Sequence, residues 1–164
     1  MEMWREYFGA GARIFGIDIQ PEVTEVAGTE IIVGDQSNKE FWDTQLPRIG
    51  QIDCFVDDGG HTTSQMMVTF DKVWPMIKPG GVYVCEDTHC CYWGGWEGGY
   101  KKEGTFVEHA KNLADLLSHE HFQGGVPSEI SSLPKDLLSV SFFNSQVVLV
   151  KGKPEFKRLI VNPK

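Results

Sequence analysis

Residues 54–61 read CFVDDGGH, a short apolar run that ends in two acids, two glycines and a histidine. Three other apolar runs also end in an acid, and they occupy residues 13–18, 30–35 and 82–87. Runs that are apolar on both faces are typical of buried parallel strands, which need helices to cross over between them. The repeated pattern therefore predicts an α/β fold built on a mostly parallel sheet.

Helical periodicity occupies the intervals between these runs. A capping box at residues 37–40 opens a helix that we expect to stop at Pro47. Apolar residues at helical spacing predict a second helix over residues 63–77, which the sequence KPGG at 78–81 would end. A third amphipathic stretch covers residues 105–117. These helices supply the crossovers that a parallel sheet requires.

The C-terminal part of the chain has a different pattern. Two extended runs, residues 137–143 and 146–150, are separated by Asn144-Ser145, which predicts an antiparallel hairpin. Residues 90–104 are rich in glycine and aromatic residues and lack periodicity, so we expect a loop that closes over a ligand. The complete pattern predicts a three-layer α/β sandwich with a mostly parallel sheet and a C-terminal antiparallel hairpin.

Composition and charge exclude several classes of partner. The 164 residues suit one domain, and 41% of them are apolar, which is enough to bury a core. Acids outnumber bases by 23 to 15, and the net charge of -8 has the wrong sign for neutralising phosphates. No apolar run is long enough for a membrane span, and no basic leader precedes an apolar segment. We therefore expect a single cytoplasmic domain that binds neither nucleic acid nor membrane.

Two acid pairs, Asp57-Asp58 and Glu86-Asp87, follow runs that are one crossover apart. Because ligands of an open parallel sheet bind outside the carboxyl ends of its strands, we expect the four carboxylates to meet at one edge. Like charges so close recruit a cation or raise one another's pKa. Mg²⁺ prefers oxygen ligands, so three carboxylates and a substrate hydroxyl would suit it, as they would Mn²⁺ or Ca²⁺. The alternative is that the acids cap helices or face solvent.

His61 follows the first acid pair across Gly59-Gly60, and glycines allow a tight turn with close approach of a ligand to the backbone. Histidine titrates near neutrality, so His61 is a candidate general base for a hydroxyl whose acidity a cation has raised. It could instead only cap the helix that begins near Thr63. His89, after the second acid pair, is either a loop residue or a partner of a metal ligand.

Asp18 and Asp35 end the first two apolar runs. An acid at such a position in a nucleotide-binding sheet accepts hydrogen bonds from ribose hydroxyls, and Asp35 could similarly accept from an adenine amino group. Aspartate is also a common turn former and helix cap, and that alternative stays open for both residues.

Cysteines and tryptophans complete the set of candidates. Cys90-Cys91 beside His89 permits a thiol nucleophile, which would leave the acid pairs unexplained. No CxxC pair occurs among the four cysteines, so we expect neither a disulfide nor a zinc framework. Trp93 and Trp96 either stack on a substrate ring or pack in the core.

These motifs together are similar to those of a known family. The chain resembles the metal-dependent O-methyltransferases of macrolide tailoring, the macrocin and mycinamicin type, which use S-adenosylmethionine. The resemblance extends from Met3 to about Phe106, and it rests on the sequences MWREYF at 3–8, RIFGID at 13–18, VDDGGH at 56–61, WP at 74–75, KPGGVY at 78–83, EDT at 86–88 and YW at 92–93.

The resemblance implies a class I methyltransferase fold with a Rossmann-like sheet. Asp58, Glu86 and Asp87 would hold Mg²⁺, and His61 would be the general base. Cofactor-binding residues, which would face S-adenosylmethionine, are then Asp18, Asp35 and Asp57. The implied partner is a small-molecule acceptor with a free hydroxyl, such as a sugar on a glycosylated natural product, and the implied assembly is a homo-oligomer.

One departure from the family pattern bears on activity. In the family, a first strand and a Gly-rich loop precede the helix that residues 1–8 resemble. We therefore expect residues 1–164 to form an N-terminally incomplete methyltransferase-like domain with a gap in its sheet. Two alternatives follow: a metal-assisted hydrolase that keeps the acids and His61, and a truncated, non-catalytic binding or assembly module.

Overall fold

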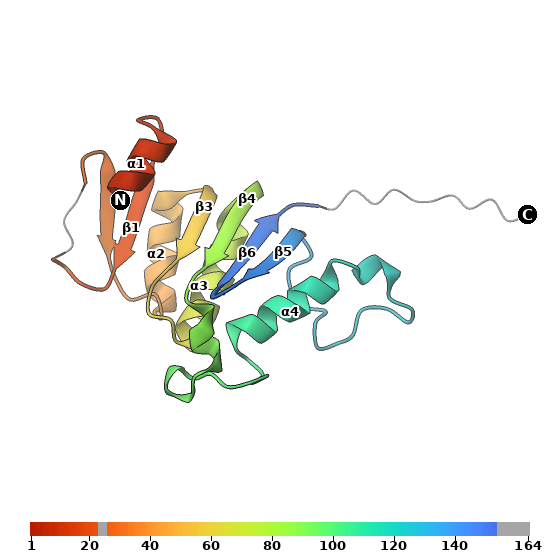
Figure 1. Ribbon diagram of the computed structural model, residues 1–164. Coiled ribbons are helices and arrows are strands. Elements are labelled where there is room, and N and C mark those ends of the chain that lie inside the picture. The colour runs from red at the N-terminus through yellow and green to blue at the C-terminus, as the bar shows by residue number, and fades with distance from the viewer. Residues whose placement is uncertain (23–25, 154–164) are drawn as a thin grey trace, which may run out of the picture.

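Parallel pairing of two strands begins the larger sheet of the computed structural model, which describes residues 1–22 and 26–153. Strand β3 (Ile52–Asp57) pairs with β4 (Ile77–Cys85), with Phe55 opposite Tyr83 and Asp57 opposite Cys85. Helix α3 (Thr63–Val73) and the short 3₁₀ helix η1 (Trp74–Met76) make the crossover between them (Figure 1).

The antiparallel hairpin forms the other half of this sheet. Strand β5 (Leu137–Phe143) pairs with β6 (Gln146–Lys151), and β6 pairs antiparallel with β4, giving the order β3-β4-β6-β5. Ser145 in the turn has φ 64°, a left-handed conformation that suits a two-residue hairpin. The predicted hairpin is therefore confirmed, as is the predicted α/β class with its mixed, mostly parallel set of strands.

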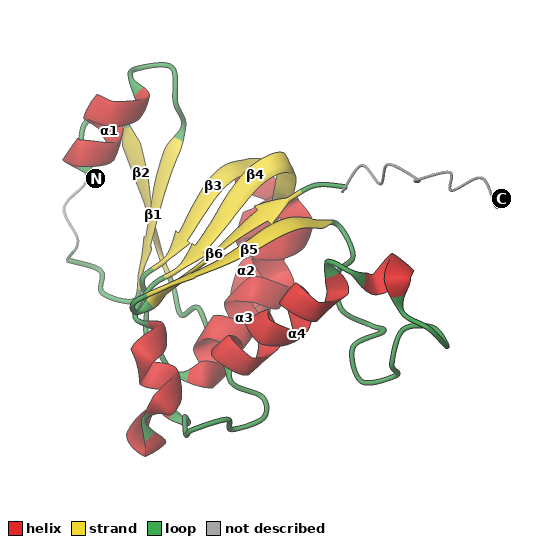
Figure 2. Ribbon diagram, turned by 45° about the vertical axis from the view of Figure 1, so that its right-hand side comes forward, coloured by secondary structure: helices red, strands yellow, loops and turns green. Residues whose placement is uncertain are grey.

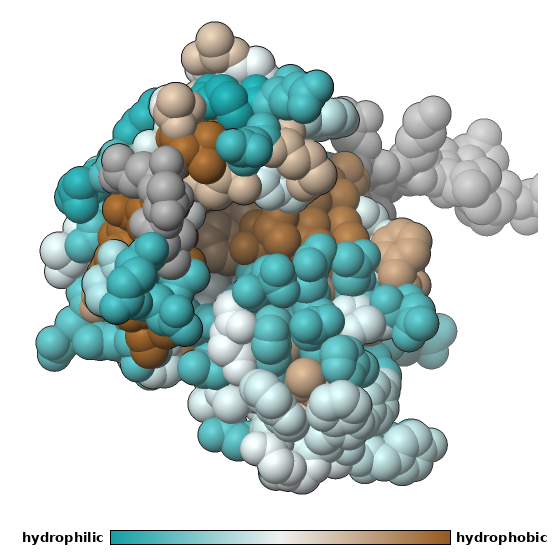
Figure 3. Space-filling view, turned by 60° about the vertical axis from the view of Figure 1, so that its left-hand side comes forward, coloured by the Kyte–Doolittle hydropathy of each residue, from teal (hydrophilic) through white to brown (hydrophobic). Residues whose placement is uncertain are grey.

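Strands β1 (Ile14–Asp18) and β2 (Thr29–Val33) pair in parallel as a separate two-stranded sheet. Within the described residues, no ladder joins this sheet to β3, so the strands stand in two groups (Figure 2). Figure 3 shows hydrophobic surface gathered in a hollow on the side of the molecule that carries β1 and β2.

Three helices cover one face of the four-stranded sheet: α2 (Lys39–Ile49), α3 and α4 (Phe106–Leu116) (Figure 2). The core lies between these helices and the sheet, and its largest fully buried rings belong to Trp42, Phe70, Tyr83 and Phe106. On the opposite face, alternate strand residues such as Val148 and Val150 are only half-buried. Helix α1 (Glu2–Phe8) lies beside the two-stranded sheet instead, where Arg5 donates to the carbonyl oxygen of Ala12.

Two predicted helix boundaries are wrong. Helix α2 begins after Asn38, whose side chain accepts from the amides of Glu40 and Phe41, and it continues through Pro47 to Ile49. Proline removes one backbone donor there, but Leu46 and Ile49 are buried, so packing holds the last turn in place. Ile77 is the first residue of β4 and does not end a helix, because Pro75 converts the end of α3 into the 3₁₀ turn η1.

Residues 90–104, which we call the aromatic loop, are preceded and partly formed by short 3₁₀ segments, η2 (Thr88–Tyr92) and η3 (Gly94–Trp96), and a further one, η4 (His119–His121), follows α4. Among the described residues, no helix has the length and apolar character that crossing a bilayer would require.

Candidate functional site

Three side chains from the carboxyl ends of β3 and β4 converge in one cluster. Asp58, His61 and Asp87 each offer one ligand atom, and these atoms all lie within 4.8 Å of one another. The imidazole Nε2 of His61 lies 3.5 Å from Oδ2 of Asp87. Asp58 is exposed and the other two are half-buried, so the cluster is open to solvent on one side. We call these three residues the acid–histidine cluster.

The backbone explains why the acid–histidine cluster forms. The amide of Glu86 donates to the carbonyl oxygen of Asp57 at 2.9 Å, which extends the β3–β4 ladder past the ends of both strands. His61 and Asp87 then adopt left-handed conformations, with φ of 58° and 50°. This conformation is energetically unfavourable for a non-glycine residue, and residues held in it are concentrated at functional sites. His61 does not cap α3, because Thr62 does so in a capping box with Gln65.

The predicted metal ligands are only partly brought together. Asp58 and Asp87 meet in the acid–histidine cluster with His61, whereas Glu86 is directed toward β6, where its Oε1 accepts from Nε2 of Gln146 at 2.8 Å. Glu86 is half-buried and lies one residue from Asp87, at the border of the cluster.

Asp57 lies beneath the cluster in the protein interior. Its Oδ2 accepts from the hydroxyl of Tyr83 at 3.0 Å, and its Oδ1 accepts from Nε2 of Gln36 at 3.0 Å. Burial raises the pKa of Asp57 to about 6, although these two hydrogen bonds oppose the shift. Both carboxylate oxygens thus have protein partners, and the expected contact of Asp57 with a cofactor stays a prediction.

Gln36 is a site residue that the sequence interpretation missed. Its Nε2 also donates to Oγ1 of the buried Thr69 on α3, and its Oε1 accepts from the amide of Gly60 at 2.5 Å. A Cβ at Gly59 would overlap the Gln36 side chain, so the close approach that the glycines allow is made by this glutamine. The sequence offered one indication that Gln36 belongs to the site, which is its position directly after Asp35, the acid that follows β2.

Asp18 and Asp35 lie at the ends of β1 and β2, on the same edge as the cluster. Oδ1 of Asp18 accepts from the amide of Gln20 at 2.8 Å, and Oδ1 of Asp35 accepts from the amide and hydroxyl of Ser37, both at 2.8 Å. Both therefore form local turns through one oxygen. Their expected contacts with ribose and adenine stay predictions.

A hydrogen bond to the start of α3 holds the aromatic loop beside the acid–histidine cluster. Oε2 of Glu97 accepts from the amide of Ser64 at 2.9 Å, and this hydrogen bond lowers the pKa of Glu97. The Trp96 ring lies 6.1 Å from the His61 ring, and Trp93 and Trp96 are both exposed. The two tryptophans are therefore available to a ligand and do not belong to the core.

A thiol nucleophile is disfavoured. The Cys90 sulfur lies 3.7 Å from Nε2 of His89, but burial raises the pKa of the Cys90 thiol, and burial also raises that of Cys91. A raised pKa opposes formation of the thiolate, which is the reactive form. All four cysteines are free.

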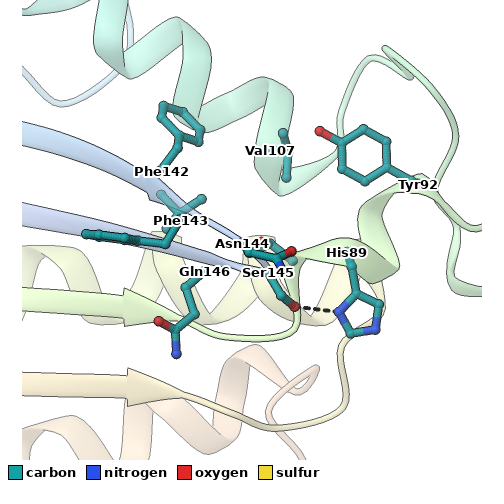
Figure 4. Close-up of a pocket in the computed structure, with 10 residues that line it drawn as sticks. His89, Tyr92, Val107, Phe142, Phe143, Asn144, Ser145 and Gln146 are labelled. Carbon is teal, nitrogen blue, oxygen red and sulfur yellow. Dashed lines mark hydrogen bonds between the residues drawn. The ribbon is translucent and has the colours of Figure 1, made fainter.

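A cavity of about 260 Å³ lies next to the carboxylates, between η2, the start of α4 and the β5–β6 turn (Figure 4). We call it the hairpin pocket. His89 and Tyr92 line it from η2, Val107 from α4, and residues 142–147 from the hairpin. Its position on the carboxyl edge of β4 makes it part of the same rim as the acid–histidine cluster.

Comparisons with known proteins agree with this geometry. The chain is 28% identical over 158 residues to the mycinamicin VI 2''-O-methyltransferase of Micromonospora griseorubida, covering 93% of this chain and 39% of the relative. It is 32% identical over 133 residues to the 8-demethyl-8-alpha-L-rhamnosyl tetracenomycin-C 2'-O-methyltransferase of Streptomyces olivaceus, covering 79% of this chain and 35% of that enzyme. The chain thus spans about two fifths of the length of these relatives.

A solved structure gives the same result. The methyltransferase MycE of the mycinamycin biosynthetic pathway, in complex with Mg and SAH, superposes with a TM-score of 0.83 at 28% identity, covering 92% of this chain and 40% of that one. The fold is accordingly the Rossmann-like methyltransferase fold that the resemblance implied. A sequence profile described as a methyltransferase domain matches residues 4–88, which include β1 to β4 and every residue of the acid–histidine cluster. The chain therefore belongs to the methyltransferase domain family.

Proposed function

We propose that the protein transfers a methyl group from S-adenosylmethionine to a hydroxyl of a sugar or glycosylated natural product, with the help of a divalent cation. The observation that carries the proposal is the acid–histidine cluster, where Asp58, His61 and Asp87 lie within 4.8 Å of one another at the carboxyl edge of β3 and β4. Two relatives of the chain are O-methyltransferases, one acting on mycinamicin VI and the other on a rhamnosyl tetracenomycin, and MycE was solved with Mg and SAH.

The donor set fits a hard cation. Two carboxylates and one imidazole offer ligand atoms within 4.8 Å of one another, and oxygen ligands are those that Mg²⁺ and Mn²⁺ prefer. Asp58 and Asp87 would hold the ion, and Glu86 would join them by releasing Gln146. When bound, the cation lowers the pKa of the acceptor hydroxyl, and the cofactor supplies an electrophilic methyl group.

His61 would receive the acceptor's proton at Nε2, which faces Asp87 and the open side of the cluster. This role requires a neutral ring with its hydrogen on Nδ1, and the nearby carboxylate of Asp87 stabilises the imidazolium that forms. Asp18 and Asp35 would accept hydrogen bonds from the cofactor's ribose and adenine through the oxygens that their local turns leave available. Trp96 would help to exclude water above His61.

Methyl transfer to a rhamnosylated acceptor tests the proposal. Product formation is followed by mass spectrometry with the protein, S-adenosylmethionine and MgCl₂, and we expect a product heavier by one methylene unit that a chelator abolishes. His61→Gln should lower the rate by about 10²–10⁴, the usual contribution of a general base. Glu129→Gln removes an exposed acid outside the site and should have no effect. The absence of product from the folded wild-type protein would overturn the proposal.

The resemblance also leads us to propose a homo-oligomer, which light scattering coupled to gel filtration would detect. We further infer a cytoplasmic location, with the support that all four cysteines are unpaired, as is usual in a reducing compartment.

A further inference from the structure

A groove of about 300 Å³ lies between α2 and the end of α3, away from the acid–histidine cluster. The buried side chains of Trp42 and Leu46 line it together with the half-buried Met76. Helix α2 leads into β3 and η1 leads into β4, so the groove lies toward the amino ends of the strands whose carboxyl ends carry the cluster. We call it the proline groove, because Pro47 and Pro75 also line it.

Each of the two prolines leaves a helical carbonyl oxygen without its usual partner. Proline has no amide hydrogen, so the carbonyl oxygen of the residue four positions earlier lacks the hydrogen bond that helical geometry would provide. Those residues are Asp43 for Pro47 and Asp71 for Pro75, and both of them line the same groove. The proline groove therefore combines apolar walls with backbone acceptors that lack their helical donors.

The charges around the groove add to this surplus of acceptors. Lys72 forms an ion pair with Asp43, so these two charges offset each other. Asp71 is exposed, and in the part of the chain that the structure describes it forms no ion pair. The neighbouring His109 does not compensate it at neutral pH, because burial lowers the pKa of His109 and keeps the ring neutral. The lining thus carries one uncompensated negative charge, that of Asp71.

The segment after α3 already binds an ammonium group, which comes from strand β6. Nζ of Lys151 donates to the carbonyl oxygen of Trp74 at 2.8 Å and to that of Pro75 at 3.3 Å. Carbonyl oxygens at the C-terminus of a helix carry a partial negative charge that favours cations. Arg48, the basic residue next to Pro47, pairs with Glu30 of β2 instead of turning to the groove. The environment of the proline groove therefore favours a further cation.

We propose that the proline groove binds an organic cation with an aliphatic body, of the class of primary alkylammonium ions. The aliphatic part would pack on Leu46 and Met76, and the ammonium would be bound by Asp71 and the unpaired carbonyl oxygens. An ammonium has three donors and no acceptor, which matches a lining of carboxylate and carbonyl acceptors. A carboxylate ligand would be repelled by Asp71, and an uncharged ligand would leave that charge uncompensated. Binding at this groove needs neither the cofactor nor the divalent cation.

NMR of the full chain, labelled with ¹³C at the methionine methyl groups, tests the proposal with hexylammonium chloride as the probe. Met76 lines the groove, and its signal is assigned from Met76→Leu. We expect a saturable shift of this signal, with a dissociation constant in the millimolar range that rises with added salt. Hexanol should bind about threefold more weakly, and hexanoate should leave the signal in place. The signal of Met3, exposed on α1, should not move in any of these titrations.

Two variants test the acceptors separately. Asp71→Asn removes the uncompensated charge and should weaken the binding of hexylammonium about threefold. Pro47→Ala supplies an amide for the carbonyl oxygen of Asp43 and should also weaken binding about threefold, and alanine is compatible with the helix. Asp115→Asn is the matched control, because Asp115 is an exposed acid near the end of α4 that does not line the groove.

The outcomes decide between an organic cation and other occupants of the groove. Equal binding of hexylammonium and hexanol, or unchanged binding in both Asp71→Asn and Pro47→Ala, would overturn the proposal. An unmoved Met76 signal in the folded protein would also overturn it. A Met76 signal that moves with protein concentration and not with hexylammonium would assign the groove to a second copy of the chain, which contradicts the proposal as well.

Discussion

The two pairs of parallel strands end in the same way but produce different arrangements of their acids. At β1–β2 the amide of Gly34 donates to the carbonyl oxygen of Asp18 at 2.8 Å, and at β3–β4 the amide of Glu86 donates to that of Asp57 at 2.9 Å. Both ladders therefore continue one step past the strands. Yet Asp18 and Asp35 bond to the backbone that follows each of them, whereas Asp58 and Asp87 converge on His61.

The residues after each strand account for the difference. Asp18 and Asp35 each accept from the backbone amide two residues further along, which turns the side chain back toward its own chain. After β3, the glycine turn and the left-handed His61 redirect the chain, and the left-handed Asp87 does so after β4. An acid at a strand end thus becomes a candidate ligand only when the following backbone leaves its oxygens free for a shared partner.

The largest expected effect concerns Asp57 and Asp18, which are the last residues of β3 and β1. Because the folded-state pKa of Asp57 is about 6 against an ordinary value of 3.8, the unfolded chain loses this proton first as pH rises. The stability that the protonated group provides is full below pH 3.8 and is lost as pH rises through 6. The free energy of unfolding of Asp57→Asn, relative to that of the wild type, should therefore rise by about 3 kcal/mol between pH 4 and pH 7.

Denaturant unfolding at several pH values measures this gain. Asp18→Asn, the matching replacement at the end of β1, is the control for removing a strand-end carboxylate. A difference between Asp57→Asn and the wild type that does not change with pH would show that Asp57 is not a buried, shifted group.

The second effect concerns the cation. Asp58→Asn removes one of the two carboxylates from the acid–histidine cluster. We expect affinity for Mn²⁺ to fall by at least about a hundredfold, because replacing a residue that only supports a metal ligand already lowers affinity by up to that factor. Electron paramagnetic resonance of the free ion measures this directly. Glu129→Gln should bind the ion as the wild type does, and unchanged binding by Asp58→Asn would place the ion elsewhere.

A third, smaller effect is expected for Gln36. Its replacement by alanine leaves the amide of Gly60 and the hydroxyl of Thr69 without their Gln36 contacts, which should lower the free energy of unfolding by about 1–3 kcal/mol. Because the glycine turn positions His61, cation affinity should fall about tenfold. Gln123→Ala, at an exposed position, is the control in both measurements. A loss of stability with full cation affinity would limit Gln36 to a structural role.

The smallest effect sharpens the comparison between the strand pairs. Asp18→Asn should leave Mn²⁺ affinity within about twofold of the wild type, because Asp18 is absent from the cluster and weak long-range charge effects are screened by salt. The same variant should weaken binding of S-adenosylhomocysteine in calorimetry if Asp18 faces the cofactor. A large loss of Mn²⁺ affinity would mean that the two strand ends form one site.

The strands and the meeting of two acids were predictable from the sequence because both follow from local patterns. Alternating or continuous apolar runs define β1 to β6, and the crossover rule brings the ends of β3 and β4 to one edge. The direction of each side chain was not predictable. Glu86 and Asp87 are neighbours in the sequence, but the Glu86 carboxylate is hydrogen-bonded to Gln146, whereas the left-handed backbone at Asp87 directs the Asp87 carboxylate toward His61.

Burial and helix ends required the tertiary structure. The family resemblance implied that Asp57 faces the cofactor, which stays a prediction, whereas its hydrogen bond with the Tyr83 hydroxyl in the interior could not be read from the sequence. Pro47 is a poor residue for a helix interior, yet the packing of Leu46 and Ile49 overrides that preference. Gln36 was missed because its partners lie in three other segments, which no local pattern reveals.

The hairpin that closes the pocket has a consequence for the order of folding. Strands β5 and β6 meet across a two-residue turn, so their pairing needs little loop closure, whereas β6 pairs with β4 over a long intervening stretch of chain. We expect the hairpin to form early and to dock on β4 late. The walls of the pocket come from both sides of that late contact, so hydrogen exchange during refolding should protect the amide of Thr88 after those of the hairpin itself.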